Sequence, residues 1–428
     1  MKAAFYTLGC KVNKYETQAM TELLQRRGFI VVGVEQSPDI IIVNSCTVTS
    51  ESDRKTRQIT RKLKRDNPEA IIVLTGCMTQ AVPEKSDKLP EADIILGNNS
   101  NIFLADEIEK YIKTGVKSKN IIPHQKGDEF KGGTITCFEE RERAFVKIQD
   151  GCNRFCSYCI IPYARGRVRS KMPEVLREEL RDIASKGYRE IVLVGINLSS
   201  YGSDIGTDIT SAVKIACDIP EIERVRLGSL EPDHITEDIL SELKKLPKFC
   251  PQFHLSLQSG CDRTLKKMNR HYTADEYEKL INKIRDLFPD ATVTTDVMVG
   301  FPEETEEDFN CSVEFVKKIG FEKVHVFPYS PRENTRAAEM AQINKAEKER
   351  RAEIMIEETS KIREAFLREQ IGKTFEILIE SSDKNGFKTG YTKNYIPVLV
   401  KCDNKYISTI QKVKIISSNK ENCCGEMI

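Results

Sequence analysis

The sequence predicts an α/β protein with three parts: an N-terminal parallel α/β domain, a central partial (βα) barrel and a small C-terminal antiparallel β-barrel. Three observations support this prediction. Apolar runs alternate with helix-compatible stretches in the first part, strands and helices also alternate in the centre, and the tail has short β-rich runs separated by Asp, Asn and Gly turns. The expected boundaries are 1–125, 135–365 and 370–428.

Four apolar runs in the first part each end in small or polar residues before a helix-like stretch. They are AAFYTLGC, DIIIVNSC, AIIVLTGC and DIILGNNS. Such runs are typical of buried parallel strands, whose carboxyl ends lie along one edge of a sheet. Cys10, Cys46 and Cys77, at the ends of the first three runs, are therefore expected to converge. A single buried cysteine is usually a core residue, but three at equivalent strand ends favour a three-thiolate cluster.

The polar segment KTGVKSKNIIPHQKGDEFKGG has no clear period and is predicted to be a linker. The strand–helix alternation after it is typical of a parallel barrel, whose active site lies at the carboxyl ends of the strands. Polar and glycine residues follow the apolar runs there: Gly195, Asn197, Ser229, Glu231, Gln258, Ser259, Asp296, Gly300, Tyr329 and Ser330. Ordinary strand-to-helix turns are the alternative explanation for individual members of this set.

The segment DGCNRFCSYCIIPYARG carries Cys152, Cys156 and Cys159 on one predicted loop. Cube-shaped iron–sulfur clusters usually take four cysteine thiolates, so three thiols this close leave one iron open to a substrate or cofactor. A closed zinc site with four ligands is the alternative, and Cys137 could supply the fourth thiolate. Three closely spaced thiols do not by themselves decide the metal.

Composition limits the other possibilities. The chain has 428 residues, with 39% hydrophobic and 31% charged residues, as expected for a globular protein of more than one domain. No apolar run approaches the ~20 residues that span a bilayer, so no membrane association is expected. Fourteen cysteines, including an adjacent pair, fit metal-bound thiols in a reducing cytoplasm better than a disulfide framework. The net charge of +1 neither favours nor excludes a nucleic-acid partner.

The stretch 341–370 is charged and helix-compatible and is interpreted as a solvated connecting helix. The tail beyond it is predicted to close into a small antiparallel barrel. Lysines interleave there with Phe387, Tyr391, Tyr395 and Tyr406. This combination weakly indicates contact with RNA.

These motifs resemble those of the radical S-adenosylmethionine methylthiotransferases over nearly the whole chain. TLGCKVNKYETQAM, NSCTVT and TGCMTQ resemble that family's N-terminal domain, CNRFCSYCIIPYARG resembles its radical triad, and the tail resembles its TRAM domain, a small RNA-binding barrel. VGINLSSYG, LGSLEP, FHLSLQSGCDRTLKKMNRHYT, TTDVMVGFP and HVFPYSPR are most similar to the branch that adds a methylthio group to C2 of N6-threonylcarbamoyladenosine at tRNA position 37. Sister branches, which modify isopentenyladenosine in tRNA or an aspartate of a ribosomal protein, are the alternatives.

The resemblance implies two [4Fe-4S] clusters and S-adenosylmethionine. Cys152, Cys156 and Cys159 would hold the cluster that makes a 5′-deoxyadenosyl radical, and Cys10, Cys46 and Cys77 the cluster that carries or donates sulfur. The residues expected to contact S-adenosylmethionine are Tyr158, Gly195, Asn197, Gln258, Asp296 and Gly300. The implied partners are tRNA and a low-potential electron donor, and the implied location is the cytoplasm. Radical chemistry suits the substrate because a purine C2–H bond is neither acidic nor readily displaced.

Two interpretations from other functional classes stay open at this point. A zinc-stabilised RNA-binding protein would not cleave S-adenosylmethionine, and an iron–sulfur electron-transfer protein would need no open coordination site and no large barrel. The chain also departs from the family pattern at Glu303 in GFPEET and Asn334 in PRENTRAA, where glycine is usual. Both departures are expected to alter loop geometry near the cofactor, and neither is a predicted cluster ligand.

Overall fold

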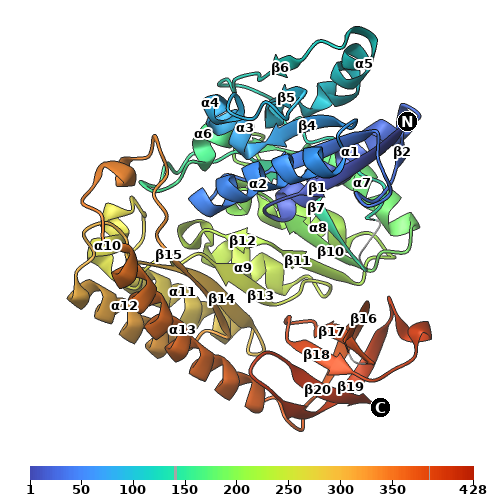
Figure 1. Ribbon diagram of the computed structural model, residues 1–428. Coiled ribbons are helices and arrows are strands. Elements are labelled where there is room, and N and C mark those ends of the chain that lie inside the picture. Colours follow the sequence, from blue (N-terminus) through green and yellow to red (C-terminus); the bar gives the residue numbers. More distant parts are fainter. Residues whose placement is uncertain (139–141, 385) are drawn as a thin grey trace.

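Parallel sheets form the first two parts of the chain and a closed barrel forms the third (Figure 1). The computed structural model describes residues 1–138, 142–384 and 386–428. The predicted α/β class, the partial barrel and the small terminal barrel are confirmed. Within the described residues, no helix combines the length and apolarity needed to cross a bilayer.

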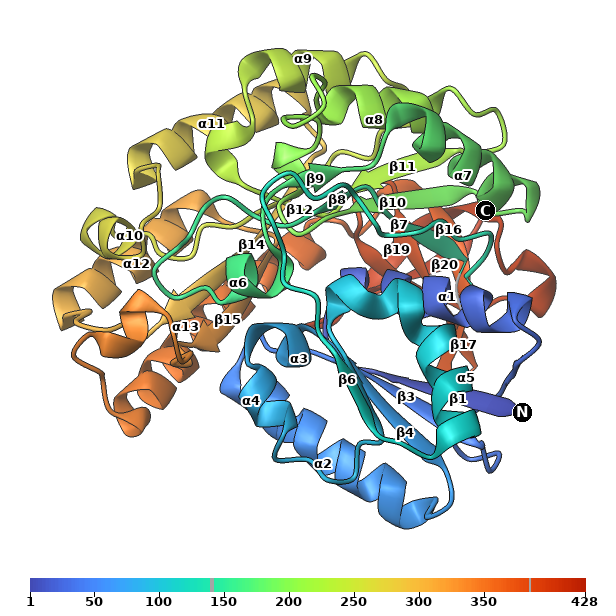
Figure 2. The ribbon, with the colours of Figure 1, turned by 90° about the horizontal axis from the view of Figure 1, so that it is seen from above.

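The N-terminal part is a six-stranded parallel sheet with the strand order β2-β1-β3-β4-β5-β6. Its strands are β1 (Lys2–Thr7), β2 (Ile30–Val31), β3 (Ile40–Ser45), β4 (Ile71–Gly76), β5 (Ile94–Leu96) and β6 (Ser118–Asn120). Its helices are α1 (Lys11–Arg26), α2 (Ser50–Asp66), α3 (Cys77–Ala81), α4 (Pro83–Ser86) and α5 (Leu104–Thr114). Helices α1 and α5 cover one face, and α2 and α3 cover the other (Figure 2). The segment predicted to be a linker supplies the edge strand β6.

The central part is an open barrel made of two parallel sheets that share one hydrophobic core. Its two sheets have the strand orders β11-β10-β7 and β12-β13-β14-β15. The strands are β7 (Arg143–Lys147), β10 (Glu190–Val194), β11 (Arg224–Leu227), β12 (Ser229–Leu230), β13 (Gln252–Leu255), β14 (Thr292–Val299) and β15 (Lys323–Pro328), and a small ribbon joins β8 (Gln149–Asp150) to β9 (Arg169–Ser170). The helices are α6 (Ile161–Arg165), α7 (Pro173–Ser185), α8 (Ile209–Cys217), α9 (Glu237–Lys244), α10 (Asp262–Lys267), α11 (Ala274–Leu287) and α12 (Glu306–Ile319). Figure 2 shows α7, α8, α9 and α11 as an outer arc around the strands.

The N-terminal part contacts both edges of the open barrel. On the β7 edge, the Lys147 Nζ atom lies 2.7 Å from Glu16 Oε1 of α1. Beyond β15, the Arg332 Nη2 atom lies 2.9 Å from Asp53 Oδ2 of α2, and both side chains are buried. The parallel sheet therefore spans the opening between the two edges, and its strand ends face the barrel interior.

Helix α13 (Lys345–Arg368) connects the central part to the tail barrel. It is more than a solvated helix, because Met355 and Leu367 are fully buried and α13 packs on β15. The tail strands are β16 (Thr374–Lys384), β17 (Phe387–Thr392), β18 (Pro397–Val400), β19 (Ile410–Ser418) and β20 (Cys423–Met427). They close in the order β16-β17-β18-β20-β19, and the pair β18–β20 is parallel while the other pairs are antiparallel.

Candidate functional site

Three cysteines lie at the carboxyl ends of the adjacent strands β1, β3 and β4. Cys10 precedes α1, Cys46 follows β3 directly and Cys77 begins α3. We call them the sheet triad. Two of them follow glycines with positive φ: a Cβ on Gly9 (φ +107°) would lie 2.9 Å from the Cys46 Cβ atom, and a Cβ on Gly76 (φ +103°) would lie 2.4 Å from the Ser45 carbonyl oxygen. Only glycine lets the strand ends approach this closely.

The sheet triad has the chemistry of a thiolate ligand set. Burial raises the pKa of Cys46, and it raises the pKa of Cys77 to about 12, with smaller contributions from the other thiols of the triad. The Arg165 guanidinium acts in the opposite direction on Cys77. These two buried thiols therefore keep their protons at neutral pH until a metal displaces them.

The other three predicted cluster cysteines lie on the loop between β8 and α6. We call Cys152, Cys156 and Cys159 the loop triad. The Cys152 N–H donates to the Gly166 carbonyl at 3.0 Å, and the Cys159 N–H donates to the Cys156 carbonyl at 3.0 Å. Burial raises the pKa of Cys152 to about 11, and burial together with the neighbouring thiols raises that of Cys159. Phe155, within the loop, has a left-handed backbone (φ +50°), a strained conformation that is common at functional sites.

Two buried side chains direct hydrogen-bond donors at the loop triad. The Arg270 Nη1 atom lies 3.4 Å from Cys156 Sγ, and the Asn197 Nδ2 atom lies 3.7 Å from Cys152 Sγ. Arg270 is held by an ion pair with Glu231, and its Nη2 atom also donates to the Ser256 carbonyl at 3.1 Å. Donors to ligating sulfurs tune cluster potentials. Arg270 was not among the predicted site residues, because it follows a helix rather than a strand end.

The predicted S-adenosylmethionine contacts do not all lie in the same environment. The Asn197 Oδ1 and Gln258 Oε1 atoms are buried and, among the described residues, accept no hydrogen bond; Gln258 also has a positive φ of +66°. Buried unpaired oxygens of this kind are expected where a polar ligand belongs. Tyr158 directly precedes Cys159 in the loop, and its ring lies edge-on to that of Phe301 with centroids 6.4 Å apart. Asn197, Gln258 and Tyr158 therefore fit a cofactor beside the loop triad.

The other three predicted contacts have structural explanations within the chain. A Cβ on Gly195 would lie 2.8 Å from Gln149 Oε1, so a larger residue there would displace the Gln149 side chain. The Gly300 N–H is already used, because it donates to Glu304 Oε2 at 2.7 Å. Asp296 points elsewhere: its Oδ2 atom lies 3.2 Å from His254 Nε2, on the wall of a separate cavity.

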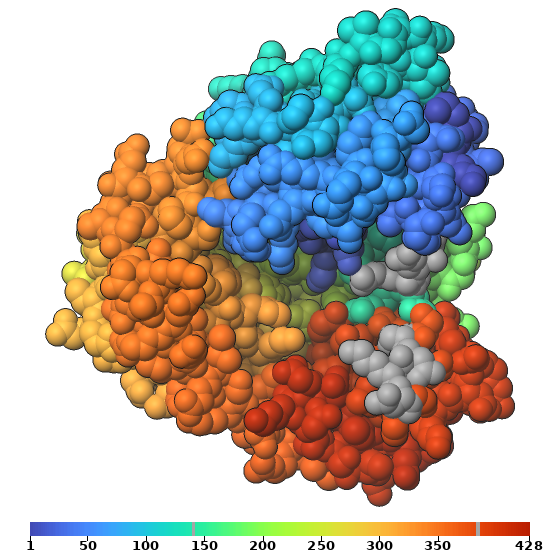
Figure 3. Space-filling view, in the orientation of Figure 1, coloured from blue at the N-terminus to red at the C-terminus, as the bar shows by residue number. Residues whose placement is uncertain are grey.

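That cavity has a volume of about 500 Å³ and is lined by all three parts of the chain. Figure 3 shows a recess between the N-terminal part and the tail barrel. Its lining includes Lys11 of α1, His254, Asp296 and His325 of the central strands, and Tyr391, Tyr395 and Pro397 of the tail. Lys11, which lines the cavity, directly follows Cys10 of the sheet triad in the sequence. We call it the central cavity.

Two of the four tail aromatics face the central barrel. The rings of Tyr391 and Tyr395 stack with centroids 4.6 Å apart. The Arg143 guanidinium lies 4.6 Å from the Tyr391 ring centroid, and the Arg226 guanidinium lies 4.5 Å from that of Tyr395. These tyrosines therefore border the central cavity, whereas Phe387 remains 38% exposed on the tail surface.

The residues present fit iron–sulfur clusters better than a zinc ion. Cys137 lies beside α1, where its N–H donates to Glu22 Oε1 at 3.3 Å and its sulfur accepts from Gln18 Nε2 at 3.7 Å. Within residues 1–138, 142–384 and 386–428, no three His, Cys, Asp or Glu side chains are arranged to hold a single metal ion. Zinc gathers its thiolates at about 2.3 Å around one ion, whereas a cube gives each thiolate its own iron.

The two departures from the family pattern share one backbone conformation. Glu303 has φ +59° and Asn334 has φ +64°. Glycine adopts this left-handed region freely, and asparagine enters it more readily than glutamate does. The Glu303 carboxylate lies 2.7 Å from Lys267 Nζ on the surface. Each position thus keeps the backbone geometry that a glycine would provide.

Comparison with known proteins agrees with this architecture. Residues 146–316 match the Radical SAM superfamily, residues 2–97 match the Uncharacterized protein family UPF0004, and residues 368–427 match the TRAM domain. The threonylcarbamoyladenosine tRNA methylthiotransferase MtaB of Bacillus subtilis is 35% identical, over 97% of this chain and 94% of the relative. The chain belongs to the radical SAM methylthiotransferase family. The methylthiotransferases use S-adenosylmethionine and two [4Fe-4S] clusters, so the zinc-protein and electron-transfer interpretations are excluded.

Other methylthiotransferases match equally well. MtaB of Aquifex aeolicus is 37% identical over 93% of this chain and 96% of its own length. A tRNA-2-methylthio-N(6)-dimethylallyladenosine synthase of Pelotomaculum thermopropionicum is 35% identical over 99% of this chain and 97% of its own length. Among solved structures, the radical S-adenosylmethionine methyltransferase TsrM from Kitasatospora setae has a TM-score of 0.56 at 15% identity, covering 90% of this chain and 79% of that chain, and shows the shared fold.

Proposed function

We propose that this enzyme methylthiolates C2 of N6-threonylcarbamoyladenosine at position 37 of tRNA. The observation that carries the proposal is the central cavity, where both triad-bearing parts and the tail barrel meet. Its walls carry ammonium, imidazole, carboxylate and phenol groups. A polar N6 substituent suits these walls, whereas a dimethylallyl group would leave them without polar partners. Relatives named for the threonylcarbamoyl substrate support the same choice.

The two triads have different proposed roles. Cys152, Cys156 and Cys159 would bind the cluster that faces S-adenosylmethionine, and Cys10, Cys46 and Cys77 would bind the second cluster. When bound, these groups supply the 5′-deoxyadenosyl radical and the transferred sulfur. Arg270 and Asn197 donate toward the loop-triad sulfurs, while the free oxygens of Asn197 and Gln258 remain available to donors on the cofactor.

The remaining assignments follow from this division. We propose an N-terminal iron–sulfur domain at 1–125, a radical domain at 135–365 and an RNA-binding domain at 370–428. The tail barrel borders the cavity, which suits a domain that holds the anticodon loop while one nucleoside enters. The partners are tRNA and a low-potential electron donor, and we propose that the enzyme acts in the cytoplasm.

Mass spectrometry of nucleosides tests the substrate. A strain lacking this enzyme should accumulate N6-threonylcarbamoyladenosine and lose its 2-methylthio derivative, and the intact gene should restore the derivative. A gene with Cys10, Cys46 and Cys77 replaced by Ala is the matched control and should not restore it. Loss of 2-methylthio-dimethylallyladenosine instead would overturn the substrate assignment.

A further inference from the structure

The basic side chains of the central cavity differ in whether they are already paired. Its lining includes Lys11, Arg226, Lys323 and Arg363. The Arg226 Nε atom lies 3.0 Å from Glu190 Oε1, and Arg363 donates to the carbonyls of Glu322 and Glu421 at 3.0 and 2.8 Å. The side chain of Lys323, at the start of β15, has no hydrogen-bond or ion-pair partner among the described residues.

The acids of the cavity leave a positive balance beside β15. Asp296 is engaged by His254, and Glu421 lies at the edge beside Arg363. Burial raises the pKa of Glu322 to about 7, so this carboxyl carries only part of a charge at neutral pH. Lys323 and Lys11 both line this cavity together with His325, which is exposed.

The geometry points to a carboxylate subsite formed by Lys323 and Lys11, which binds the acidic end of the N6 substituent of the substrate adenosine. This inference rests on the proposed function and names the residues that choose the substrate. The threonylcarbamoyl group ends in a carboxylate that two ammonium groups can neutralise. A dimethylallyl group offers no hydrogen-bond acceptor, so binding it would desolvate the Lys323 ammonium without compensation.

Binding to anticodon stem-loops tests the subsite directly. One stem-loop carries the free threonylcarbamoyl acid and the other its neutral methyl ester. The reconstituted enzyme should bind the acid about two- to fivefold more tightly than the ester, as for a partly exposed ion pair. Lys323→Met and Lys11→Met should reduce that ratio toward one, and Lys323→Arg should keep it. Lys412→Met, at an exposed position on β19, is the matched control and should leave the ratio unchanged.

An unchanged acid-to-ester ratio in both Lys→Met variants would overturn the subsite. Turnover, measured in parallel, separates this result from failure of the proposed function. Methylthiolation of the acid with no effect of either lysine would leave the function standing and remove the subsite. Acid-selective binding that depends on Lys323, without methylthiolation, would support the subsite and overturn the proposed function.

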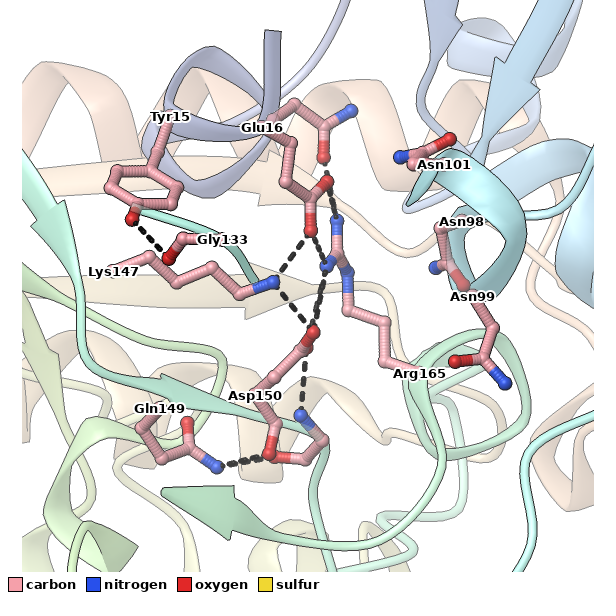
Figure 4. A network of polar contacts seen from close by, with 12 residues as sticks. Tyr15, Glu16, Asn98, Asn99, Asn101, Gly133, Lys147, Gln149, Asp150 and Arg165 are labelled. Carbon is pink, nitrogen blue, oxygen red and sulfur yellow. Dashed lines mark hydrogen bonds and ion pairs between the residues drawn. The ribbon is translucent and has the colours of Figure 1, made fainter. Parts of the chain in front are cut away.

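A second inference concerns Arg165, which ends α6 directly after the loop triad. Its side chain is 1% exposed and points into the N-terminal part (Figure 4). The guanidinium donates to both Glu16 carboxylate oxygens at 2.6 and 2.9 Å and to Asn13 Oδ1 at 2.9 Å. The Asn13 amide donates in turn to the carbonyls of Leu8 and Ser45, next to the sheet triad.

Arg165 lies where the segment that carries the loop triad contacts the part that carries the sheet triad. Helix α6 packs against α3, which begins at Cys77. The Arg165 Nε atom is buried and, among the described residues, donates to no acceptor. We infer that Arg165 is a positioning residue that supplies a positive charge to the sheet-triad site. The segment that carries one triad would thus set the electrostatics of the other, since net charge and hydrogen bonding tune cluster potentials.

The reduction potential of the sheet-triad cluster tests this role. The background carries Ala at Cys152, Cys156 and Cys159, so that only one cluster titrates. Arg165→Gln should lower the reduced-to-oxidised ratio at a fixed potential at least about tenfold, which is a 59 mV fall for one electron. Arg165→Lys keeps the positive charge, so its reduction potential should stay close to that of the background. Arg169→Gln, which removes another buried cation paired with Asp150, is the control and should shift the potential less.

A second variant covers the case in which Arg165→Gln does not fold. Asn13→Ser keeps the Arg165–Glu16 pair and removes the amide that links it to the strand ends, so the potential should move in the same direction by a smaller amount. An unchanged potential in the folded variants, or an equal shift in Arg169→Gln, would overturn the inference.

Discussion

The loop triad and the sheet triad each bring three thiols together, but the loop triad does so within one short segment and the sheet triad through three distant segments. The loop triad comes from eight consecutive residues, and its shape depends on a strained backbone at Phe155 and on donors from Asn197 and Arg270. The sheet triad comes from three segments far apart in the chain, and its shape depends on the register of β1, β3 and β4. One site is therefore sensitive to its local surroundings, and the other is sensitive to the fold of a whole sheet.

Replacing the loop triad with Ala should have the largest effect. Loss of Cys152, Cys156 and Cys159 should remove about half of the iron, because the sheet triad keeps its own cluster. Formation of 5′-deoxyadenosine and methylthiolation should both become undetectable. Iron analysis and anaerobic S-adenosylmethionine cleavage measure these effects. Full iron retention would contradict the assignment of these cysteines as ligands.

Replacing the sheet triad should separate the two activities. With Ala at Cys10, Cys46 and Cys77, S-adenosylmethionine cleavage should remain detectable while methylthiolation is lost. The reason is that the loop triad and its donors belong to a different sheet system. Deoxyadenosine and modified nucleosides are measured in the same reaction. Continued methylthiolation of tRNA would rule out the sheet triad as the second cluster site.

Gly76→Ala should damage the sheet triad without touching a ligand. The new Cβ would lie 2.4 Å from the Ser45 carbonyl oxygen at a φ of +103°, which destabilises the native state by about 3 kcal/mol. The strand ends that carry Cys46 and Cys77 should separate, and about half of the iron should be lost. Urea unfolding and iron content measure both effects. The matched change in the loop that carries the other triad is Phe155→Gly. It relieves the strain of a positive φ, so the protein should retain all the iron.

The sheet triad was predictable from sequence for a physical reason. Buried parallel strands leave a repeated apolar pattern, and their ends must converge at one edge. The loop triad was visible from its spacing alone. By contrast, Arg165 contacts Asn13 and Arg270 contacts Cys156 across more than 100 residues of sequence, and no local pattern predicts either contact. The inward stacking of Tyr391 and Tyr395 depends on how the tail barrel docks on Arg143 and Arg226, which composition does not encode.

The central cavity should make the stability of the protein depend on pH through Glu322. Burial raises the pKa of this carboxyl from 4.5 to about 7. Below pH 4.5 both folded and unfolded forms are protonated. As the pH rises toward 7, only the unfolded form ionises, so the free energy of unfolding falls, by up to about 3 kcal/mol. Glu322→Gln should remove this loss.

Urea unfolding at pH 5 and pH 8 measures the difference between the wild type and Glu322→Gln. The stability advantage of the variant should be larger at the higher pH. Glu421→Gln, at the exposed edge of the same cavity, is the control and should show little change. An equal advantage of Glu322→Gln at both pH values would show that this carboxyl titrates normally.

The smallest expected effect distinguishes the two departures from glycine. Glu303→Gly relieves a left-handed backbone at φ +59° but adds unfolded-state freedom and removes an exposed pair with Lys267. Asn334→Gly relieves less, since asparagine tolerates this conformation. We therefore expect the free energy of unfolding of Glu303→Gly to be about 0.5 kcal/mol higher than that of Asn334→Gly. Urea midpoints measured at a constant m-value give this difference. Because Glu303→Ala lacks the ion pair and keeps the strain, it should be the least stable variant at that position. A Glu303→Ala protein as stable as Glu303→Gly would mean that this backbone is unstrained.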